Sequence, residues 1–558
     1  MIKNIFIFFF LVIISFGLVI DLFINKGQPV TFDGPTHITN IAMFYKSLKE
    51  GNIQVTWTDG FANYGMPLGL MAQQVTSYLG AYINFLTQDP LTSYNLVLLI
   101  GAFFSNLTLY IFLREYFCSF ISLAAVFIFN LAPYRIINIY VRGALPEFFA
   151  SIWLPLILLG IKRFLETNKF FYFVLISLSF SLMILTHPFM LIIYSFPIIF
   201  FSIFLISQRK GWLKKIFYLS SSFILGFLLS SYFIVPLSLE LKYFYYGLAK
   251  NHFNFGHFLS WENFFDPRWF YFYKDDIAPR GHFMKTGLLE IFLVVGFLLF
   301  FIFLRKKTEK TYLPLLRTVF LSLIIYIFFL IPQSSFFYKN FSLLGNVQHP
   351  WRMLSGFIFL PPIILGFFVD KALSHLQNKA KLNIKLIIIH LLFVIISFSR
   401  IPQLYGKNYQ LVPKENYFFT KENLHAVILN TIWTGKAEDY PVKKIKGEIV
   451  EGEGKLKVNE IKNNYRKYYL KAKTPVRLVD YTFYFPGWRV YANRKKIPIE
   501  FQDPNYRGVI TYKLDQGESE ILVKFEETKA RFLGKFLSLL GICSLILFYA
   551  KRKVLFNN

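Results

Sequence analysis

Long apolar runs recur along most of this chain, and they constrain its fold more than any other feature of the sequence. A helix needs about 20 apolar residues to cross the hydrocarbon core of a bilayer. A soluble chain of 558 residues would not carry many runs of this length. The sequence therefore predicts a mainly α-helical, polytopic membrane protein with about twelve transmembrane helices. The apolar runs lie at residues 4–24, 95–113, 119–132, 148–164, 171–186, 189–207, 216–236, 287–304, 315–332, 353–370, 383–399 and 532–550.

The first apolar run is expected to stay in the protein as a helix. Residues 1–24 contain Lys3 as their only basic residue and Asp21 near their end. The run is too long for a simple signal peptide, and it lacks a small-residue cleavage site. It is therefore predicted to be a retained transmembrane helix.

Basic residues gather in alternate loops between the apolar runs. The formal net charge of +28 would also be typical of a nucleic-acid-binding protein. Clusters such as residues 305–307 and 551–553 instead follow the positive-inside pattern of membrane proteins, so no nucleic-acid partner is expected. With the N-terminus inside, the segments predicted on the outer face of the cytoplasmic membrane are 25–94, 133–147, 237–286, 333–352 and 400–531.

Three parts are predicted from the places where the apolar pattern breaks. Residues 1–399 form a membrane domain whose first outer loop is 25–94. Residues 400–531 are more charged and contain β-rich runs such as 477–485, so an extracytoplasmic β-sandwich-like domain is expected there. Residues 532–558 supply the final transmembrane helix and a basic cytoplasmic tail.

The first outer loop opens with Asp33-Gly34-Pro35-Thr36-His37, directly after the first apolar run. If a helix begins at Pro35, Asp33 and His37 point towards the same entrance at the membrane surface. A carboxylate there is able to accept a proton from a hydroxyl nucleophile. Asp before Gly-Pro is also a good helix N-cap, and that interpretation of Asp33 stays open.

An amphipathic helix lying in the membrane interface is predicted over residues 36–49, because apolar residues recur there at helical spacing. Beyond it, residues 57–67 form a turn rich in glycine and aromatic residues that contains Asp59, Asn63 and Tyr64. A carboxylate, an amide and aromatic faces together suit a sugar, which needs hydrogen bonds and a stacking surface. Turn formation alone would also explain these residues.

Charged residues also stand where outer loops meet apolar runs. Arg142 and Glu147 end the second outer loop. Charged residues at membrane depth are costly, so Arg142 either binds a phosphate or pairs with Glu147 at the surface. His349 and Arg352 precede the run 353–370 from the outside. Because a helix N-terminus favours anions, Arg352 indicates an anionic partner such as a phosphate, with snorkelling to the interface as the alternative.

The remaining motifs give no support to other enzyme classes. No Walker A loop, Rossmann glycine pattern or HExxH motif is present, so ATP, dinucleotide and zinc-protease chemistry lack support. His187, before Pro188 in a short outer turn, is predicted to be a turn residue and not a ligand.

Several of these motifs, taken in order, carry a family resemblance. The chain resembles bacterial membrane proteins of the C-type (GT-C) glycosyltransferase superfamily. It is most similar to the pyruvoyl-tetrahydropterin-synthase-related membrane proteins and the YfhO-like proteins. The matching motifs are Asp33 to His37, residues 57–68, Arg142-Gly143-Ala144 with Glu147, Pro350-Trp351-Arg352 and residues 484–491.

The resemblance implies an inverting membrane glycosyltransferase that uses a polyprenyl-phosphate-linked sugar on the outer face. The acceptor would be a hydroxyl of a glycan, a lipid or a protein. In the superfamily an acidic residue of the first outer loop is the base, and Asp33 holds that position. Asp59 and Glu147 are both candidates for a second acidic residue, and Arg352 or Arg142 would stabilise the leaving phosphate. Members differ in metal dependence, so no metal is assigned and a divalent cation is left open.

Two other classes of function compete with the transferase. A transporter or flippase for a lipid-linked glycan would show Gly/Pro-interrupted spans in matching halves, and no such pairing is seen. A non-catalytic membrane protein could use its β-domain to bind polysaccharide. Convergence of Asp33, Arg142 and Arg352 would favour the transferase, and scattered positions would favour the non-catalytic protein.

Overall fold

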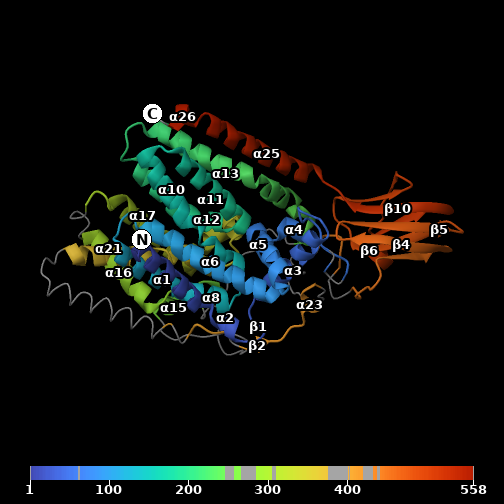
Figure 1. The fold of residues 1–558 in the computed structure, drawn as a ribbon, viewed down its shortest axis with the longest axis horizontal. Coiled ribbons are helices and arrows are strands. Elements are labelled where there is room, and N and C mark those ends of the chain that lie inside the picture. The colour runs from blue at the N-terminus through green and yellow to red at the C-terminus, as the bar shows by residue number, and fades with distance from the viewer. Residues whose placement is uncertain are drawn as a thin grey trace.

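Helices make up most of the protein, and a sheet region projects from one end of them (Figure 1). This confirms the prediction of a mainly helical chain with a C-terminal sheet region. The structure is a computed structural model. It describes residues 2–58, 60, 63–245, 257–265, 284–303, 309–374, 400, 403–406, 408–418, 431–435 and 440–556.

Most of the longer helices follow the predicted apolar runs, one follows the amphipathic stretch of the first outer loop, and others lie in segments predicted as outer loops. Those of the first half are α1 (Ile2–Val19), α2 (Asp21–Ile24), α3 (Gly34–Lys49), α4 (Leu68–Met71), α5 (Gln74–Thr87), α6 (Pro90–Leu113), α7 (Ser119–Asn130), α8 (Pro133–Tyr140), α9 (Leu145–Ala150), α10 (Trp153–Thr167), α11 (Phe170–Thr186), α12 (Met190–Ile206) and α13 (Trp212–Glu240). Those that follow are η1 (Leu241–Tyr243), α15 (Trp261–Phe265), α16 (Leu288–Phe303), α17 (Leu313–Leu330), η4 (Pro332–Ser334), α18 (Ser335–Asn340), α19 (Ser342–Gly345), η5 (Pro350–Met353), α20 (Leu354–Phe357), α21 (Leu360–Ser374), α23 (Lys414–Phe418), η8 (Pro504–Tyr506), α25 (Lys529–Ala550) and α26 (Arg552–Phe556), where η marks a 3₁₀ helix.

The predicted number of spans, about twelve, is not confirmed. In the described residues, six helical segments are long and apolar enough to cross a membrane, or seven if the bent pair α7 and α8 is one span. The apolar helices α1, α11, α12 and α16 are shorter, and 17 residues rise only about 25 Å against a core of about 30 Å. The predicted run 383–399 lies outside the described residues.

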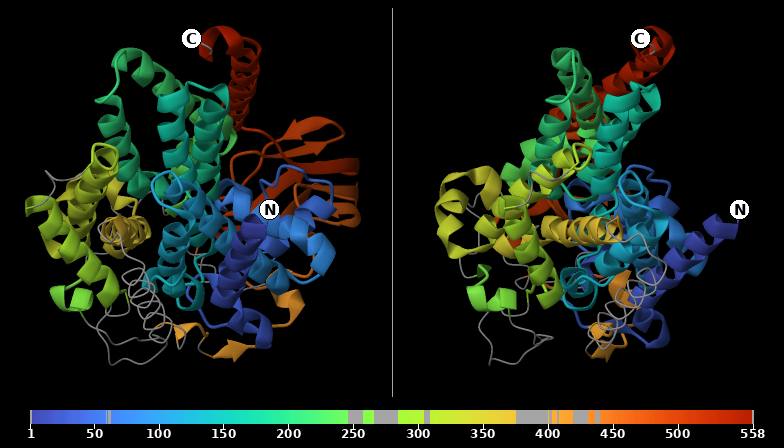
Figure 2. Two further views of the ribbon diagram at one scale, coloured as in Figure 1. Left: turned by 60° about the vertical axis from the view of Figure 1, so that its left-hand side comes forward. Right: turned by 90° about the vertical axis from the view of Figure 1, so that its left-hand side faces the viewer.

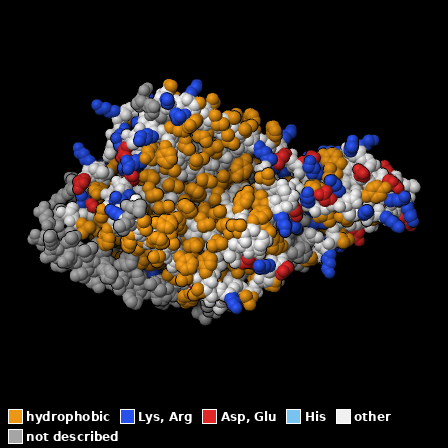
Figure 3. Space-filling view, in the orientation of Figure 1, with side chains coloured by type: hydrophobic (Ala, Val, Ile, Leu, Met, Phe, Trp, Pro, Cys, Tyr) orange, Lys and Arg blue, Asp and Glu red, His pale blue; other side chains and the backbone are white. Residues whose placement is uncertain are grey.

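The surface of the helical body is broadly apolar, whereas charged side chains gather on the sheet region and at the far end of the helices (Figure 3). Helix α25 exposes large side chains such as Phe532, Phe536 and Leu547. Such a surface is expected in lipid, where apolar side chains gain nothing by leaving the hydrocarbon. The distribution supports a multi-pass membrane protein.

The C-terminal region contains two antiparallel sheets. One has five strands in the order β4-β5-β10-β7-β8, and the other has three in the order β3-β6-β9. Their inward side chains, among them Tyr468, Leu478, Trp488 and Tyr512, share one hydrophobic core. The strands are β3 (Gly447–Glu451), β4 (Gly454–Lys462), β5 (Tyr465–Ala472), β6 (Val476–Phe483), β7 (Trp488–Ala492), β8 (Lys495–Ile497), β9 (Val509–Leu514) and β10 (Gly517–Phe525).

A buried ion pair joins the sheet region to the helices. Nη2 of Arg531, at the start of α25, lies 3.1 Å from Oε2 of Glu240, at the end of α13. The same nitrogen donates to the carbonyl of Pro486, just before β7, at 2.7 Å. Because α13 and α25 also pack side by side (Figure 2), Arg531 fixes the orientation of the sheet region on the helix pair.

Helix α3 links the sheet region to the first outer loop. At its C-terminal end, Ser47 Oγ accepts from Asn463 Nδ2 at 2.9 Å, and Glu50 accepts from the Asn463 N–H at 2.8 Å. The apolar side of α3, including Ile38, Ile41 and Ala42, is buried as predicted. Asn40 and Ser47 are buried too, so α3 is enclosed over more of its circumference than a helix lying on a membrane surface would be.

The segment before α3 is held by a short two-stranded sheet, β1 (Gln28–Pro29) with β2 (Tyr409–Gln410). The Asp21 carboxylate accepts from Tyr409 Oη at 2.5 Å and from the Gly406 N–H at 2.7 Å. These contacts fix the chain that leads into Asp33.

Candidate functional site

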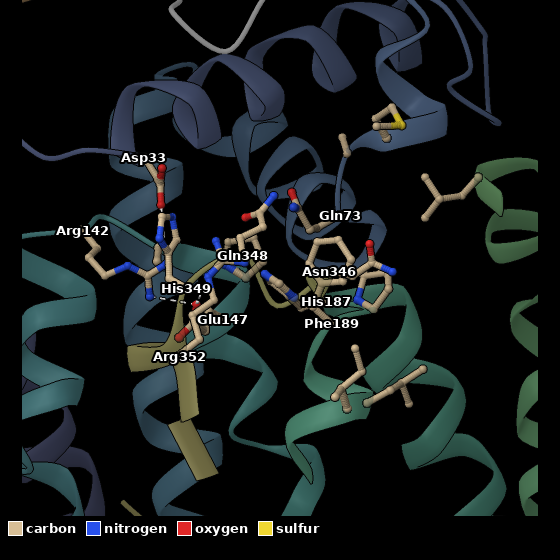
Figure 4. A pocket seen from close by; sticks show the side chains of 18 of the residues that line it. Asp33, Gln73, Arg142, Glu147, His187, Phe189, Asn346, Gln348, His349 and Arg352 are labelled. Carbon is tan, nitrogen blue, oxygen red and sulfur yellow. Dashed lines mark ion pairs between the residues drawn. The ribbon is translucent and has the colours of Figure 1, made fainter. Parts of the chain in front are cut away.

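A cavity of about 1040 Å³ lies between α3, α9, α12, α13, α17 and the segment 343–352. One part of its lining is charged or polar, and another part, from α12, α13 and α17, is apolar. Figure 4 shows the polar side chains converging from several helices. Of the residues singled out from sequence, those that line this cavity are Asp33, His37, Arg142, Glu147, His349 and Arg352.

Asp33 occupies the N-cap position of α3, but its side chain makes no capping hydrogen bond. Its Oδ2 instead lies 3.7 Å from Nη2 of Arg142, and the Asp33 side chain is 28% exposed. The Asp33 N–H donates to the Arg142 carbonyl at 2.6 Å. The side chain is therefore positioned beside Arg142 and not used to satisfy the helix end.

Two glycines allow this close crossing of the Asp33 and Arg142 segments. Gly143 has φ +65°, a conformation that favours glycine. A Cβ on Gly143 would lie 2.6 Å from the Gly34 nitrogen, and a Cβ on Gly34 would lie 2.3 Å from Thr31 Oγ1. The glycines of both predicted motifs thus bring the two charged side chains together.

Glu147 is the buried anchor of the charged group. Its side chain is 1% exposed, and Oε2 lies 2.8 Å from Nη1 of Arg142 and 3.7 Å from Nε of Arg352. Its Oε1 accepts from Tyr134 and Ser355, each at 2.6 Å. The Arg142–Glu147 pair expected from sequence therefore exists, but it is buried and not at the surface.

The two arginines differ in how their donors are used. Besides the pair with Glu147, Nη1 of Arg142 donates to Asn138 at 2.7 Å and to Tyr134 at 3.1 Å. Within the part of the chain that the structure describes, the Arg352 guanidinium makes no hydrogen bond. The Arg352 side chain is 12% exposed and lines the cavity. Its donors are available to a ligand.

Arg352 lies near the N-terminus of a continuous helical segment, Pro350–Ser374, which is long enough to cross a membrane. This segment begins with the 3₁₀ helix η5, and α20 and α21 follow it. Arg352 therefore stands near a helix start, as expected from the sequence, and the attraction of that helix end for an anion stays a prediction. The guanidinium adds a positive charge of its own at this position.

Aromatic and imidazole rings pack together beside the arginines. His349 stacks on Trp351 with ring centroids 4.8 Å apart, and His257 stacks on His349 with centroids that are also 4.8 Å apart. The Arg142 guanidinium lies 4.4 Å from the centroid of Trp351, within the range of a cation–π contact. Trp351 thus contacts Arg142 in addition to the ion pair with Glu147.

Two histidines in this region are held neutral. Burial, with the charges of Arg352 and His257 nearby, lowers the pKa of His349 to about 2. Burial and the charge of Arg352 likewise lower the pKa of His187 to about 3. His187 lines the cavity, a position that the sequence argument missed. The available signal was that both histidines directly precede a proline beside an apolar run.

The other residues proposed to hold a sugar are placed elsewhere. Asn63 Nδ2 donates to the Lys443 carbonyl at 2.8 Å, and Tyr64 Oη donates to the Pro441 carbonyl at 3.1 Å. The Tyr64 ring stacks on Phe483 with centroids 4.8 Å apart. Both residues dock the first outer loop on the sheet region and do not line the cavity. Asp59 lies outside the described residues.

In the described ranges, no group of three or more His, Cys, Asp or Glu side chains could hold a metal ion. The charged group of the cavity is instead built from arginine–carboxylate pairs. This arrangement leaves cationic donors, and not a cluster of acidic ligands, facing the cavity.

A comparison with protein families finds one match that covers more than half of the chain. The matching family is described as a 6-pyruvoyl-tetrahydropterin synthase related domain, a membrane protein, and it matches residues 75–403. The chain belongs to this family. A comparison with curated proteins finds no match.

The pterin-synthase-related match covers only part of the site. It includes the segments that carry Arg142, Glu147, His187 and Arg352, whereas Asp33 and α3 precede it. The strands β3 to β10 follow it. The match thus spans the segments that carry the arginine–glutamate cluster, and Asp33 lies N-terminal to it.

Proposed function

We propose that this protein is an inverting membrane glycosyltransferase, which moves a sugar from a polyprenyl phosphate to an acceptor hydroxyl at the outer face of the membrane. One observation carries the proposal. An accessible carboxylate, Asp33, and a guanidinium with unused donors, Arg352, line one cavity whose remaining wall is apolar. A polyprenyl-phosphate-linked sugar combines the same chemistry, since it has an anionic phosphate between a polar ring and an apolar chain.

Exposure distinguishes the roles of the two acidic residues. The side chain of Asp33 is 28% exposed, whereas that of Glu147 is 1% exposed and contacts two arginines. A general base must come within hydrogen-bond reach of the proton that it abstracts. Asp33 is therefore assigned as the base, and Glu147 as the residue that positions Arg142 and Arg352.

The phosphate is assigned to Arg352. Its guanidinium has donors to spare and faces the cavity, and a planar guanidinium can bind a phosphate through two parallel hydrogen bonds. Arg142 is 4% exposed and already holds Asn138, Tyr134 and Glu147. Arg142 would therefore act on the reaction mainly through the position of Asp33.

The apolar wall of the cavity suits the lipid part of the donor. It is formed by Leu191, Ile192 and Phe196 of α12, Ile234 and Leu237 of α13, and Phe329 of α17. An isoprenoid chain on these side chains would stay in apolar surroundings, so its transfer from the bilayer into the cavity would cost little.

The proposed step is a single displacement. The acceptor oxygen attacks the anomeric carbon, and the bond from that carbon to the phosphate oxygen breaks. The acceptor proton moves to the Asp33 carboxylate, and the electron pair of the broken bond leaves with the polyprenyl phosphate. Arg352 stabilises the charge that develops on the leaving oxygen. The neutral imidazoles of His187 and His349 add no further charge.

A transferase needs Asp33, Arg142 and Arg352 in one place, whereas a non-catalytic polysaccharide-binding membrane protein does not. All three residues line the same cavity, and this supports the transferase. A lipid-linked glycan transporter would also need a lipid-phosphate site. However, it would not need a carboxylate that is free of capping bonds beside that site.

Lipid and glycan profiling of three strains tests the proposal. One strain lacks the protein, one carries Asp33→Asn, and one carries the wild type. The deletion and Asp33→Asn strains are expected to accumulate the same sugar-bearing polyprenyl phosphate and to lose the same glycan decoration. A wild-type profile in the Asp33→Asn strain would overturn the transferase assignment.

A further inference from the structure

Neutral amide side chains line the cavity beside the charged group. Asn40 comes from α3, Gln73 precedes α5, and Asn346 follows α19. In Figure 4, Gln73 and Asn346 lie on the side of the cavity away from Arg142. None of these positions follows an obvious motif in the sequence.

These amides have hydrogen-bonding capacity that the described protein does not use. Asn40 is 6% exposed, yet it lines the cavity and makes no side-chain hydrogen bond within the described residues. The same holds there for the side chains of Gln73 and Asn346. Buried amides are normally hydrogen-bonded, because an amide without a partner loses its contacts with water. The unused capacity of Asn40 indicates a ligand group in the cavity.

A strained backbone position adds independent support. Gln348 lines the cavity with φ +67°, in the left-handed region that residues other than glycine rarely adopt. Such outliers cluster at ligand-binding sites, where the surrounding structure holds them in place. Figure 4 shows the Gln348 side chain between the charged group and Gln73.

We infer that Asn40, Gln73 and Asn346 form a subsite for an uncharged, hydroxyl-bearing sugar ring, and that this subsite selects the donor sugar. The inference rests on the proposed transferase function and names the class of sugar. An amide offers both donors and an acceptor, as a sugar hydroxyl does. Each amide can therefore bind a hydroxyl whichever way the hydroxyl proton points.

The subsite discriminates against acidic sugars. Its three side chains are neutral. Among the described residues that line the cavity, the cationic donors are those of Arg142 and Arg352, in the charged group where the phosphate is assigned. A uronic acid ring at the amides would bury a carboxylate without a cationic partner, which is costly. The donor is therefore an ordinary hexose or pentose carried on the lipid phosphate.

Binding to the purified full-length protein in lipid nanodiscs tests this inference. The probes are polyprenyl phosphate without sugar, glucosyl polyprenyl phosphate and glucuronosyl polyprenyl phosphate. The variants are Asn40→Leu, Gln73→Leu and Asn346→Leu, and the control is Gln208→Leu, an exposed amide just beyond α12. Each cavity variant is expected to weaken binding of the glucosyl lipid about fivefold, while the sugar-free lipid binds as to the wild type.

One further variant guards against misfolding as an explanation. Gln73→Lys adds a cation and should raise affinity for the glucuronosyl lipid. The inference is overturned if the Leu variants weaken both glucosyl and sugar-free lipids equally or leave both unchanged. Failure of the wild type to bind sugar-free polyprenyl phosphate would overturn the proposed function itself, and this inference with it.

Discussion

Nη1 of Arg142 lies 2.8 Å from Oε2 of Glu147, and both side chains are almost fully buried. This pair connects the other charged side chains that line the cavity. Arg142 reaches from Glu147 to Asp33, and Glu147 reaches from Arg142 to Arg352. Neither residue of the pair needs to touch a substrate for the site to depend on it.

Removal of the Glu147 side chain is therefore expected to lower the stability of the folded protein. Glu147→Ala leaves two buried guanidinium groups without their carboxylate, and breaking a buried pair costs about 3–5 kcal/mol. The matched control is Glu309→Ala, because Glu309 pairs with Lys371 but is 64% exposed, and exposed pairs contribute at most about 1 kcal/mol. Thermal unfolding in detergent should show a much larger loss for Glu147→Ala. Equal losses would show that the pair does not anchor the site.

The crossing at Gly143 gives a second prediction. Gly143→Ala places a methyl group 2.6 Å from the Gly34 nitrogen, which pushes Asp33 away from Arg142. A displacement of about 1 Å at a reacting group can lower a rate 100-fold. Gly51→Ala is the control, because Gly51 has φ +89° but nothing within 4 Å of its added Cβ. Transfer should be lost in Gly143→Ala and kept in Gly51→Ala. Equal activity of the two variants would show that the close approach of Gly143 to Gly34 is not needed for transfer.

Much of the fold could be predicted because the bilayer imposes a simple length rule on apolar runs. Most of the longer described helices fall on the predicted runs, and α3 falls on the predicted amphipathic stretch, whereas α5 and α8 lie in segments predicted as outer loops. The predicted number of spans is not confirmed, because four apolar helices are shorter than a full span in the described residues and the run 383–399 lies outside those residues. Hydropathy also does not show the bend between α7 and α8.

The site could be predicted in part. Asp33, Arg142 and Arg352 stood out because charges beside apolar runs are costly without a role. Tyr64 was assigned to a sugar because aromatic turns suit sugars. Its ring instead packs on Phe483, which is far away in the sequence, so no pattern around Tyr64 indicated this contact. Asn40 could not be found, because a polar residue on an amphipathic helix is expected to face solvent.

Arg352 should control affinity for the donor. Arg352→Ala removes a charge-assisted contact with the phosphate, and it is expected to raise the donor KM about 10- to 100-fold. Arg352→Lys should have a smaller effect, because lysine keeps the charge and loses the planar fork. Donor dependence of transfer by the purified enzyme measures both. If Arg352→Ala leaves that dependence unchanged, Arg142 becomes the phosphate ligand, and if Arg142→Ala does so as well, the phosphate site fails.

The neutral histidines predict a pH dependence of stability. The pKa of His187 is about 3 and that of His349 about 2 in the folded protein, against 6.5 for an unperturbed histidine. Between these values the unfolded chain binds more protons than the folded one, so stability falls as pH falls below about 6.5. Each histidine contributes up to about 1.4 kcal/mol per pH unit in that window. Melting temperatures from pH 7.5 to 4.5 should fall less steeply in His187→Phe than in the wild type, and an identical slope would contradict a buried neutral His187.

The proposed mechanism depends most directly on Asp33 as the general base. The most direct measurement is the rate of sugar transfer by purified wild type, Asp33→Asn and Asp33→Glu in lipid, with the melting temperature of each. Loss of the base should lower the rate of Asp33→Asn by about 100- to 10,000-fold. Its melting temperature should change little, because the Asp33 side chain makes no capping bond and is partly exposed. Asp33→Glu should keep part of the activity. Full transfer by Asp33→Asn would contradict the account, because the cavity would then work without the carboxylate to which the chemistry is assigned.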